Sequence, residues 1–201
     1  MEHPKIEKTL TIIKPDGVQR SLIGEIIKRY ERIGLKLVAV KMVVPSEEMI
    51  EEHYTLDKTW KERTGRKTIE SYLNKGLKPP SEDPLVLGES IITSLKKYMT
   101  AGPVVVMVWQ GANAVAVVRK ITGSTEPLTS DVGTIRGDLM LDSYFLADND
   151  KRSVRNIVHV SGSVDEAKNE INHWFQEEDL IKYQLVGEKI LYDVNIDGIL
   201  E

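Results

Sequence analysis

The sequence predicts an α+β fold of the ferredoxin-like (split β-α-β) type, an antiparallel four-stranded sheet with helices packed on one of its faces. Strand-like and helix-like segments alternate along the 201 residues, without the short hairpin links of an all-β protein. The glycine-rich loop that follows the first strand of a dinucleotide-binding protein is also missing from the sequence. The length suits one well-packed domain, so residues 1–201 are expected to form a single unit.

The first part of the chain contains two predicted strands and two predicted helices. Residues 9–13 alternate in character and run into a Lys-Pro-Asp-Gly turn, which is typical of a strand that ends there. Residues 22–33 have apolar side chains at helical spacing. Residues 35–44 predict the second strand, and 46–54 the second helix. Residues 55–89 are polar with little periodicity, and we expect an insertion on the surface with at most one short helix.

The middle of the chain predicts a central strand between two helices. Residues 90–100 have helical character, and the continuous apolar run 104–109 is typical of a strand in the middle of a sheet. Asn113 is expected to cap the next helix, which ends at Gly123. A long loop is expected over 124–138.

The last part of the chain predicts a second insertion, a short strand and one long helix. The insertion, rich in aspartate, covers about 139–153, and the strand covers 154–158. Ser163 and Glu166 have the spacing of a capping box, and the helix after them has one apolar stripe. The tail 177–201 is expected to pack on the body or on a neighbouring chain.

Charge and composition exclude several classes of function. The formal net charge is −4, so neither nucleic acid nor a membrane is expected as a partner. A bound phosphate therefore needs a local cluster of cations. The chain has no cysteine, which excludes disulfides, thiolate catalysis and cysteine-ligated metals. A polar N-terminal segment, without an apolar run of about 20 residues, predicts a cytoplasmic protein.

The four histidines are the strongest candidate nucleophiles near neutral pH. His3 lies in a terminus, His173 borders an apolar stripe, and His53 suits either the core or a site. His159 ends a predicted strand just before a helix N-terminus at Ser163, a place where proteins bind phosphates. His159 is therefore the candidate for covalent chemistry.

Glu170 is the candidate partner of His159. It follows Ser163 by two helical turns and lies on the same side of the predicted helix. A carboxylate there could hold one ring nitrogen of His159 and leave the other free to attack. The alternative is a surface glutamate paired with a lysine, and spacing alone leaves both interpretations open.

Lys14, Arg119 and Arg136 are the candidate phosphate-binding cations. An arginine guanidinium matches two phosphate oxygens, and the two arginines flank a loop that contains Thr125. Each cation also has a simpler interpretation. Lys14 suits a solvated position, Arg119 suits the C-terminal end of a helix dipole, and Arg136 suits an ion pair with Asp138 or Asp131.

Six segments taken together resemble the nucleoside diphosphate kinase family. They occur in order between about residues 8 and 176, interrupted by the two insertions. The combination of Asn-x-x-His with Gly-Thr-x-Arg-Gly-Asp is specific. The matching segments are Thr9–Val18, His53-Tyr54, Tyr98–Val105, Ala114–Gly123, Gly133–Asp138 and Arg155–His159.

The resemblance implies an enzyme that moves the γ-phosphoryl group of a nucleoside triphosphate to a nucleoside diphosphate. A ping-pong exchange through phosphohistidine at His159 is implied, which maintains nucleoside triphosphate pools. Mg²⁺ is implied as cofactor, held mainly by the nucleotide phosphates and water, with no metal ligands from the protein. Contacts to phosphates and sugar imply broad base specificity.

The resemblance also implies roles for individual residues. Arg119, Arg136 and Thr125 would contact phosphates, Lys14 and Asn156 would hold the sugar hydroxyls, and Ser161 would support the imidazole together with Glu170. The implied catalytic residues are His159, Glu170, Lys14 and Tyr54, and the implied nucleotide-binding residues are Lys14, Ile91, Leu95, Arg119, Thr125, Arg136 and Asn156.

Three positions depart from the family pattern: Ile91, Val160 and Gly162. Ile91 stands where the family usually has a phenylalanine that stacks on the base, an interaction worth about 1–3 kcal/mol per base. Tyr72 or Trp60 of the first insertion are candidates to replace it. Residues 160–163 read Val-Ser-Gly-Ser where the family usually has Gly-Ser-Asp-Ser, so Gly162 lacks a carboxylate that would reach magnesium through water.

Family members form hexamers or tetramers, and the resemblance favours a homohexamer here. The segment 178–193 loosely resembles the C-terminal part of hexameric forms, and 124–131 corresponds to a subunit-contact loop.

Two other functions are considered. A nucleotide-binding sensor of the same fold with reduced turnover is favoured by Ile91, Gly162 and the first insertion. A ferredoxin-like RNA-binding module would need a basic face and exposed aromatic residues, against which the net charge of −4 and only two phenylalanines argue.

Overall fold

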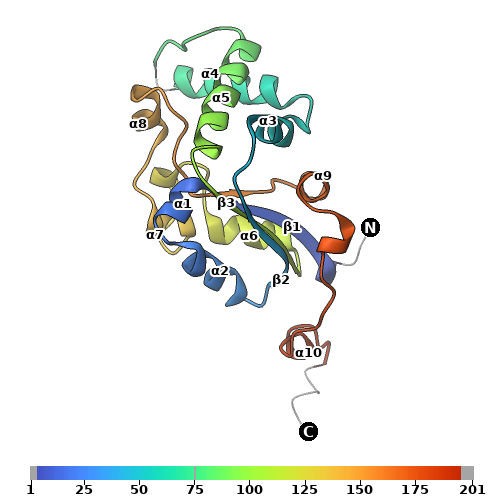
Figure 1. Ribbon diagram of the computed structural model, residues 1–201. Coiled ribbons are helices and arrows are strands. Elements are labelled where there is room, and N and C mark those ends of the chain that lie inside the picture. The colour runs from blue at the N-terminus through green and yellow to red at the C-terminus, as the bar shows by residue number, and fades with distance from the viewer. Residues whose placement is uncertain (1–3, 75, 196–201) are drawn as a thin grey trace.

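The computed structural model describes residues 4–74 and 76–195, and its sheet confirms the predicted α+β, ferredoxin-like fold (Figure 1). Four antiparallel strands lie side by side in the order β2-β3-β1-β4. Two connections therefore cross over the sheet, as the split β-α-β arrangement requires. The strands are β1 (Glu7–Ile13), β2 (Lys36–Val43), β3 (Val104–Gly111) and β4 (Val158–Val160).

The described α-helices occupy the predicted helical segments, both insertions and three further places. Those outside the insertions are α1 (Pro15–Gln19), α2 (Ile23–Glu31), α3 (Glu47–Thr55), α5 (Pro84–Met99), α6 (Ala114–Thr122), α7 (Ile135–Leu139), α9 (Val164–Trp174) and α10 (Glu188–Leu191). Of these, α1 lies where a turn was predicted, α7 at the end of the predicted loop, and α10 in the tail. The insertions contain α4 (Trp60–Asn74) and α8 (Tyr144–Asn149), and short 3-10 turns lie at Pro4–Ile6, Pro127–Thr129 and Glu177–Asp179.

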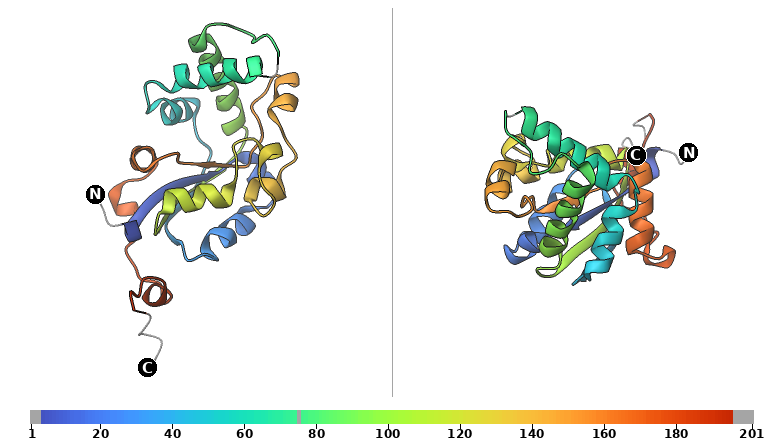
Figure 2. Two further views of the ribbon diagram at one scale, coloured as in Figure 1. Left: turned by 180° about the vertical axis from the view of Figure 1, so that it is seen from behind. Right: turned by 90° about the horizontal axis from the view of Figure 1, so that it is seen from above.

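Helices cover both faces of the sheet, so the expectation of one covered face was wrong (Figures 1 and 2). Successive side chains of a strand point to opposite faces, so a strand buried along its length needs cover on both sides. In β3, Val104, Val106 and Val108 join a core with α3, α5 and α9. Val105, Met107 and Trp109 join a second core with α2 and α6.

The first insertion contains a 15-residue helix, α4, rather than at most one short helix. The helix expected to begin at Ser90 also begins earlier, with α5 starting at Pro84. The two helices pack very closely because a glycine stands at each crossing. A Cβ atom at Gly65 would collide with the Pro84 carbonyl, and one at Gly88 with the Lys61 carbonyl. Since α4 packs on helices rather than on the sheet, its sequence lacks a strong apolar stripe.

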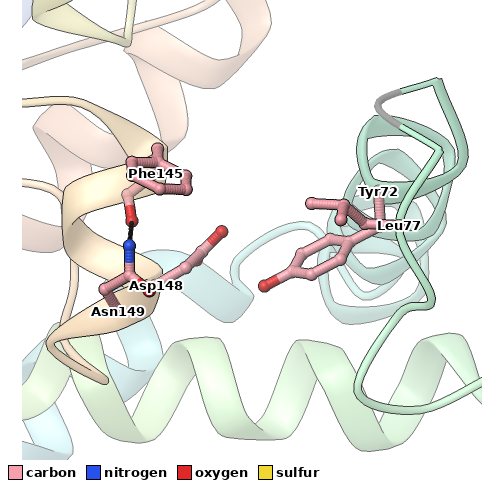
Figure 3. A pocket seen from close by; sticks show the side chains of 5 residues that line it. All are labelled: Tyr72, Leu77, Phe145, Asp148 and Asn149. Atoms are coloured by element: carbon pink, nitrogen blue, oxygen red, sulfur yellow. Dashed lines mark hydrogen bonds between the residues drawn. The ribbon is translucent and has the colours of Figure 1, made fainter.

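The second insertion contacts the first. Its helix, α8, follows Ser143, whose hydroxyl accepts a hydrogen bond from the Leu146 amide. A pocket of about 180 Å³ lies between the two insertions, lined from one side by Tyr72 and Leu77 and from the other by α8 (Figure 3). The Tyr72 hydroxyl faces the carboxylate of Asp148 across this pocket. The insertions therefore meet above the sheet instead of extending separately into solvent.

The last strand lies four residues later than expected, at 158–160 instead of 154–158. The segment before it is held by side chains and not by a neighbouring strand. The carboxylate of Asp142 accepts hydrogen bonds from the Arg155 amide, at 2.6 Å, and from the Arg152 guanidinium, at 2.7 Å. His159 is consequently inside the strand, paired with Ile12, rather than at its end.

Two predicted helix caps have different outcomes. The Ser163 hydroxyl accepts from the Glu166 amide at 3.1 Å, which confirms the N-cap of α9. Asn113 stands at the N-cap of α6, but its side chain makes no capping bond. The carboxylate of Glu7 instead accepts from the Val115 amide at 2.8 Å. The expected loop 124–138 also differs, because it includes a 3-10 turn and the first residues of α7.

The described part of the tail packs on the body along β2. The Ile181 amide donates to the Val38 carbonyl, and the Tyr183 hydroxyl donates to the Leu37 carbonyl. The predicted tail reaches 201, so residues 196–201 of it lie outside the described residues, as does His3. Among the described helices, none has both the length and the apolar character needed to cross a membrane.

Candidate active site

His159 lies on β4 with its ring directed at α9, where Glu170 meets it. Its Nε2 is 2.7 Å from Glu170 Oε1, and its side chain is 13% exposed. A carboxylate only accepts, so Nε2 carries the hydrogen and the lone pair of Nδ1 is left available. Strand pairing with β1 fixes the backbone on one side, and the carboxylate fixes the ring on the other.

Glu170 is buried, and each of its two carboxylate oxygens accepts one hydrogen bond. Its second oxygen, Oε2, accepts from the Ser161 hydroxyl at 2.6 Å, and Ser161 Oγ in turn accepts from the Leu10 amide at 3.2 Å. Burial by itself would raise the pKa of Glu170, but His159, with help from His53 and Ser161, lowers it to about 2. Glu170 is therefore an anion at neutral pH, bound to the sheet through Ser161.

His53 joins this group, a position that its sequence context left open between core and site. Trp174 Nε1 donates to His53 Nδ1 at 3.1 Å, and the His53 ring stands edge-on to His159 with centroids 4.6 Å apart. Burial, and then the neighbouring His159, lower the pKa of His53 to about 3, so it is neutral. Its Nε2 lies 3.6 Å from Glu170 Oε1, beyond hydrogen-bonding distance, and has no hydrogen-bond partner in the described structure.

His53, His159 and Glu170 are close enough to suggest a metal site, but their chemistry does not fit Mg²⁺. Their potential ligand atoms lie within 4.8 Å of one another. Mg²⁺ takes oxygen ligands, whereas two of these atoms are imidazole nitrogens. Trp174 also donates to His53 Nδ1, so a neutral His53 carries its hydrogen on Nε2 and cannot ligate through that atom.

Lys14 and Asn156 form a buried polar pair at the end of β1. Lys14 Nζ donates to Asn156 Oδ1 at 2.7 Å, and Asn156 Nδ2 donates to the Thr125 carbonyl at 2.9 Å. Burial, with the Arg136 charge as a smaller cause, lowers the pKa of Lys14 to about 7. The Asn156 side chain thus joins the lysine to the loop that contains Thr125.

Arg136 is buried and holds two segments together. Its guanidinium donates to the carbonyls of Gly123, Ser124, Asn156 and Val158. The predicted alternative, an ion pair with a nearby aspartate, is wrong, since Asp138 pairs with Arg29 at 2.7 Å. Four of the five guanidinium donors are used within the chain, so little bidentate capacity for phosphate remains.

Arg119 is the accessible arginine of the pair. It is exposed at the end of α6, and its guanidinium lies 3.6 Å from the position that a Cβ atom of Gly162 would take. No carboxylate of the described residues lies within ion-pair distance of it. Its charge acts on Arg136, which places the two cations near one another. Arg119 is therefore free to bind an anion beside the His159 strand.

Tyr54 stands on α3 beside the two histidines. Its ring centroid is 5.9 Å from that of His159, and its other neighbour is Trp60, at 5.5 Å. Burial raises the pKa of Tyr54, so its hydroxyl stays protonated. Both candidates to replace the base-stacking aromatic ring already have partners: Trp60 packs on Tyr54, and Tyr72 faces α8.

Ile91 and Leu95 lie on α5 and are half-buried. Leu95 packs against the core formed with α3 and α9, whereas Ile91 is outside that core. Ile92 and Met99 of α5 belong to that core, so Leu95 borders the core while Ile91, near the middle of the helix, lies outside it.

Comparison with known proteins identifies the family. The sequence profile described as "Nucleoside diphosphate kinase" matches residues 7–68 and 87–180, leaving only part of the first insertion unmatched between them. The chain belongs to the nucleoside diphosphate kinase family. A nucleoside diphosphate kinase from Pyrobaculum aerophilum is 48% identical over 181 residues, covering 88% of this chain and 99% of the relative. Nucleoside diphosphate kinase A of Canis lupus familiaris is 40% identical, covering 93% and 97%.

Solved structures give the same answer. A crystal structure of an NDP kinase from Pyrobaculum aerophilum matches with a TM-score of 0.84 at 46% identity, covering 88% of this chain and all of the other. A transition-state mimic of nucleoside-diphosphate kinase from Borrelia burgdorferi, with bound vanadate and ADP, matches with a TM-score of 0.76 at 33% identity, covering 93% and 97%. The predicted family and enzyme class are confirmed, and a sensor without turnover is not favoured.

Three parts of the site were missed from the sequence. His53 was left undecided, Trp174 was assigned only to the apolar stripe of its helix, and Asp142 was lost among other acidic residues of the second insertion. The adjacency of His53 to Tyr54, within a matching family segment, was the one available signal. Asp142 has no sequence signal, because its role depends on a fold that brings Arg152 and Arg155 to it.

Proposed function

We propose that this chain moves the γ-phosphoryl group of a nucleoside triphosphate onto His159 and from there to a nucleoside diphosphate. The observation that carries the proposal is the contact of 2.7 Å between His159 Nε2 and the buried Glu170 carboxylate. In the neutral imidazole this contact places the hydrogen on Nε2 and leaves the lone pair on Nδ1, and a free lone pair is what nucleophilic attack on phosphorus requires.

The two half-reactions use the same atoms in opposite directions. In the first, the Nδ1 lone pair attacks the γ-phosphorus, and the bond to the β,γ-bridging oxygen breaks as the diphosphate leaves. In the second, a terminal oxygen of the acceptor diphosphate attacks the phosphorus, and the bond to Nδ1 breaks. The His159 Nε2–H stays hydrogen-bonded to Glu170 in both half-reactions, so the ring does not rotate between them.

The cations are proposed to bind different groups of the nucleotide. Arg119 binds a phosphate, since it is exposed and lacks an ion-pair partner among the described residues. Arg136 shapes the phosphate loop and contributes positive potential, with one N–H left for the ligand. Thr125 lies in that loop, and the pair Lys14–Asn156 is placed for the sugar hydroxyls. Tyr54 lies beside the transferring group.

Mg²⁺ is proposed as the cofactor, bound by nucleotide phosphates and water. When bound, it neutralises charge on the phosphates that leave and enter. The histidine and glutamate cluster does not suit it, as shown above, and Gly162 offers no carboxylate for a water-mediated contact.

The experiment is a phosphoprotein trap followed by a chase. The protein is incubated with γ-labelled ATP and Mg²⁺, quenched in base, and then chased with GDP. Label that forms, is lost in acid, and moves to GDP supports the proposal. His159→Ala should remove all label, while His173→Asn, which changes another histidine near the site, should keep it. Label that persists in His159→Ala would contradict the assignment of the nucleophile.

The assembly is proposed to be a homohexamer. In the loop 124–131 that corresponds to a subunit contact, Leu128 is 75% exposed, and Val132, the next residue after the loop, is 94% exposed. Val40 and Met42 are more than half exposed on β2, which is an edge strand. Exposed apolar residues on an edge strand indicate an interface. Native mass spectrometry should give six times the mass of the chain, and a monomer would contradict it. A cytoplasmic location stays a prediction.

A further inference from the structure

One buried polar atom beside His159 has no role in the reaction described so far. His53 is 3% exposed, yet its Nε2 has no hydrogen-bond partner in the described structure. An unsatisfied buried donor costs free energy, and such atoms in folded proteins call for a reason. The position of this donor, between two groups of the candidate active site, supplies one.

The hydrogen on His53 is fixed to Nε2 by its neighbour. Trp174 Nε1 can only donate, and it donates to His53 Nδ1 at 3.1 Å. Since burial keeps His53 neutral, its single hydrogen is on Nε2. That N–H lies 3.6 Å from Glu170 Oε1 and has no hydrogen-bond partner among the described residues.

Glu170 has room for this donor. Oε2 is taken by Ser161 at 2.6 Å and Oε1 by His159 at 2.7 Å, and each carboxylate oxygen can accept two hydrogen bonds. The two imidazoles approach the same oxygen from perpendicular rings, at an interplanar angle of 80°. A shift of about half an ångström would close the contact, and hydrogen bonds in active sites often tighten only when the ligand is bound.

We propose that His53 is a positioning residue whose Nε2–H becomes a second donor to Glu170 Oε1 in the nucleotide complex, so that the carboxylate stays aimed at His159. This inference rests on the proposed function of His159. With the second donor in place, Glu170 cannot swing away as charge develops on the His159 ring. The reacting ring therefore keeps one tautomer and one orientation through both half-reactions.

A matched pair of substitutions separates this role from packing. The side-chain amide of Gln reaches the place of His Nε2 and can donate to Glu170. The side-chain oxygen of Asn reaches the place of His Nδ1 and can accept from Trp174. His53→Gln and His53→Asn lose the same ring, but each keeps a different hydrogen bond.

Rapid-quench kinetics of phosphorylation by ATP should separate the two variants. We expect His53→Asn to react about tenfold more slowly than His53→Gln at saturating ATP, with similar KM, because only the Asn variant loses the donor to a charged group. Thermal unfolding should show the opposite order, with His53→Gln the less stable, because Trp174 is left without an acceptor. Equal phosphorylation rates in the two variants would overturn the proposal.

Nitrogen NMR gives a test that does not need turnover. Long-range ¹H–¹⁵N spectra of the protein with ADP and Mg²⁺ should show His159 protonated on Nε2 in the unchanged protein and in His53→Gln. In His53→Asn a mixture of tautomers is expected. An unchanged His159 tautomer in His53→Asn would overturn the positioning role. A chain that forms no phosphohistidine but shows the expected NMR difference would contradict the proposed function alone.

Discussion

The floor and the roof of the candidate site are built in different ways. The floor consists of β1, β3, β4 and the α9 helix that carries Glu170, where most strand side chains belong to one of two cores and His159 is held by strand pairing. The roof consists of α4 and α8, the two insertions, which meet around a pocket of about 180 Å³ (Figure 3). In the roof, Phe145 is 67% exposed and Leu77 is 49% exposed.

This difference places the groups that react in the densely packed floor, and the groups that cover the site in the less densely packed roof. Dense packing fixes side chains to within small distances, which is what phosphoryl transfer requires of the groups that touch phosphorus. Because the roof has a cavity and exposed apolar residues, substitutions there should reduce the free energy of unfolding less than substitutions in the floor. The following predictions test how far that separation holds, beginning with the floor.

Glu170→Gln should have the largest effect, a fall of about a hundredfold in the rate of phosphorylation. The neutral amide can donate as well as accept, so it no longer fixes the hydrogen on His159 Nε2. Rapid-quench measurement of the first half-reaction checks this. Asp165→Asn, an exposed carboxylate on the same helix, is the matched control and should react at the normal rate. An unchanged rate in Glu170→Gln would mean that the floor tolerates loss of its central anion.

The same substitution also has a pH signature. Glu170 has its pKa lowered to about 2 in the folded chain, against a usual value near 4.5. Its ionised form therefore contributes stability that is complete above about pH 4.5 and is lost as pH falls toward 2. Urea unfolding at pH 7 and pH 3 should show a smaller loss in Glu170→Gln than in the unchanged protein.

Gly65→Ala should destabilise the roof by about 2 kcal/mol. A Cβ atom there collides with the Pro84 carbonyl, so α4 and α5 must move apart. The matched control is Gly24→Ala on α2, where a Cβ atom meets nothing within 4 Å. It should stabilise the protein by about 0.5–1 kcal/mol through helix propensity. Equilibrium unfolding compares the two, and a tolerated Gly65→Ala would show that the roof is loose even at its closest helix crossing.

Lys14→Met should raise the free energy of unfolding by about 1 kcal/mol while it weakens nucleotide binding. Burial is the main cause that lowers the Lys14 pKa to about 7, so the folded chain loses this proton at a lower pH than the unfolded chain does. Between about pH 7 and 10.5 the unfolded state binds more protons, and stability rises with pH. Urea midpoints at pH 7 and 9 should differ less in Lys14→Met. Unchanged stability at both pH values would contradict the buried-charge explanation.

Ile91→Phe should have the smallest effect, about a threefold lower KM for nucleotide. A ring at this half-buried position restores stacking on the base without touching the floor. Steady-state kinetics with ATP and GDP measures it, with Ile91→Leu as the control that changes shape but adds no ring. An unchanged or higher KM would show that the roof already covers the base from another side.

The sequence predicted the structure best where the periodicity or capping pattern of a short segment also determines how that segment packs in the fold. The order of strands and helices and the Ser163 cap follow from spacing that the fold preserves. The pairing of His159 with Glu170 was left open by spacing and was implied by the family resemblance. The continuous apolar run of β3 correctly predicted a central strand. Such a run also requires helices on both faces of the sheet, whereas helices on only one face were expected. The α4 helix escaped prediction because glycine-mediated contact with another helix leaves no apolar stripe.

The remaining errors have one physical origin. The start of β4 was misplaced because Asp142, Arg152 and Arg136 hold the residues before it through side-chain bonds to the main chain. Such bonds join segments that are distant in sequence, so neither periodicity nor propensity reports them. His53 was undecided for the same reason, because its tautomer depends on Trp174, 121 residues away.

The guanidinium of Arg136 connects two segments that are distant from each other in the sequence. It ties the 123–124 loop and the 156–158 segment to the same planar group. A substitution that removes this guanidinium therefore releases both segments at once. Under the roles proposed for them, loss of Arg136 should weaken nucleotide binding and slow phosphorylation of His159 together, so the two properties cannot be separated at this position.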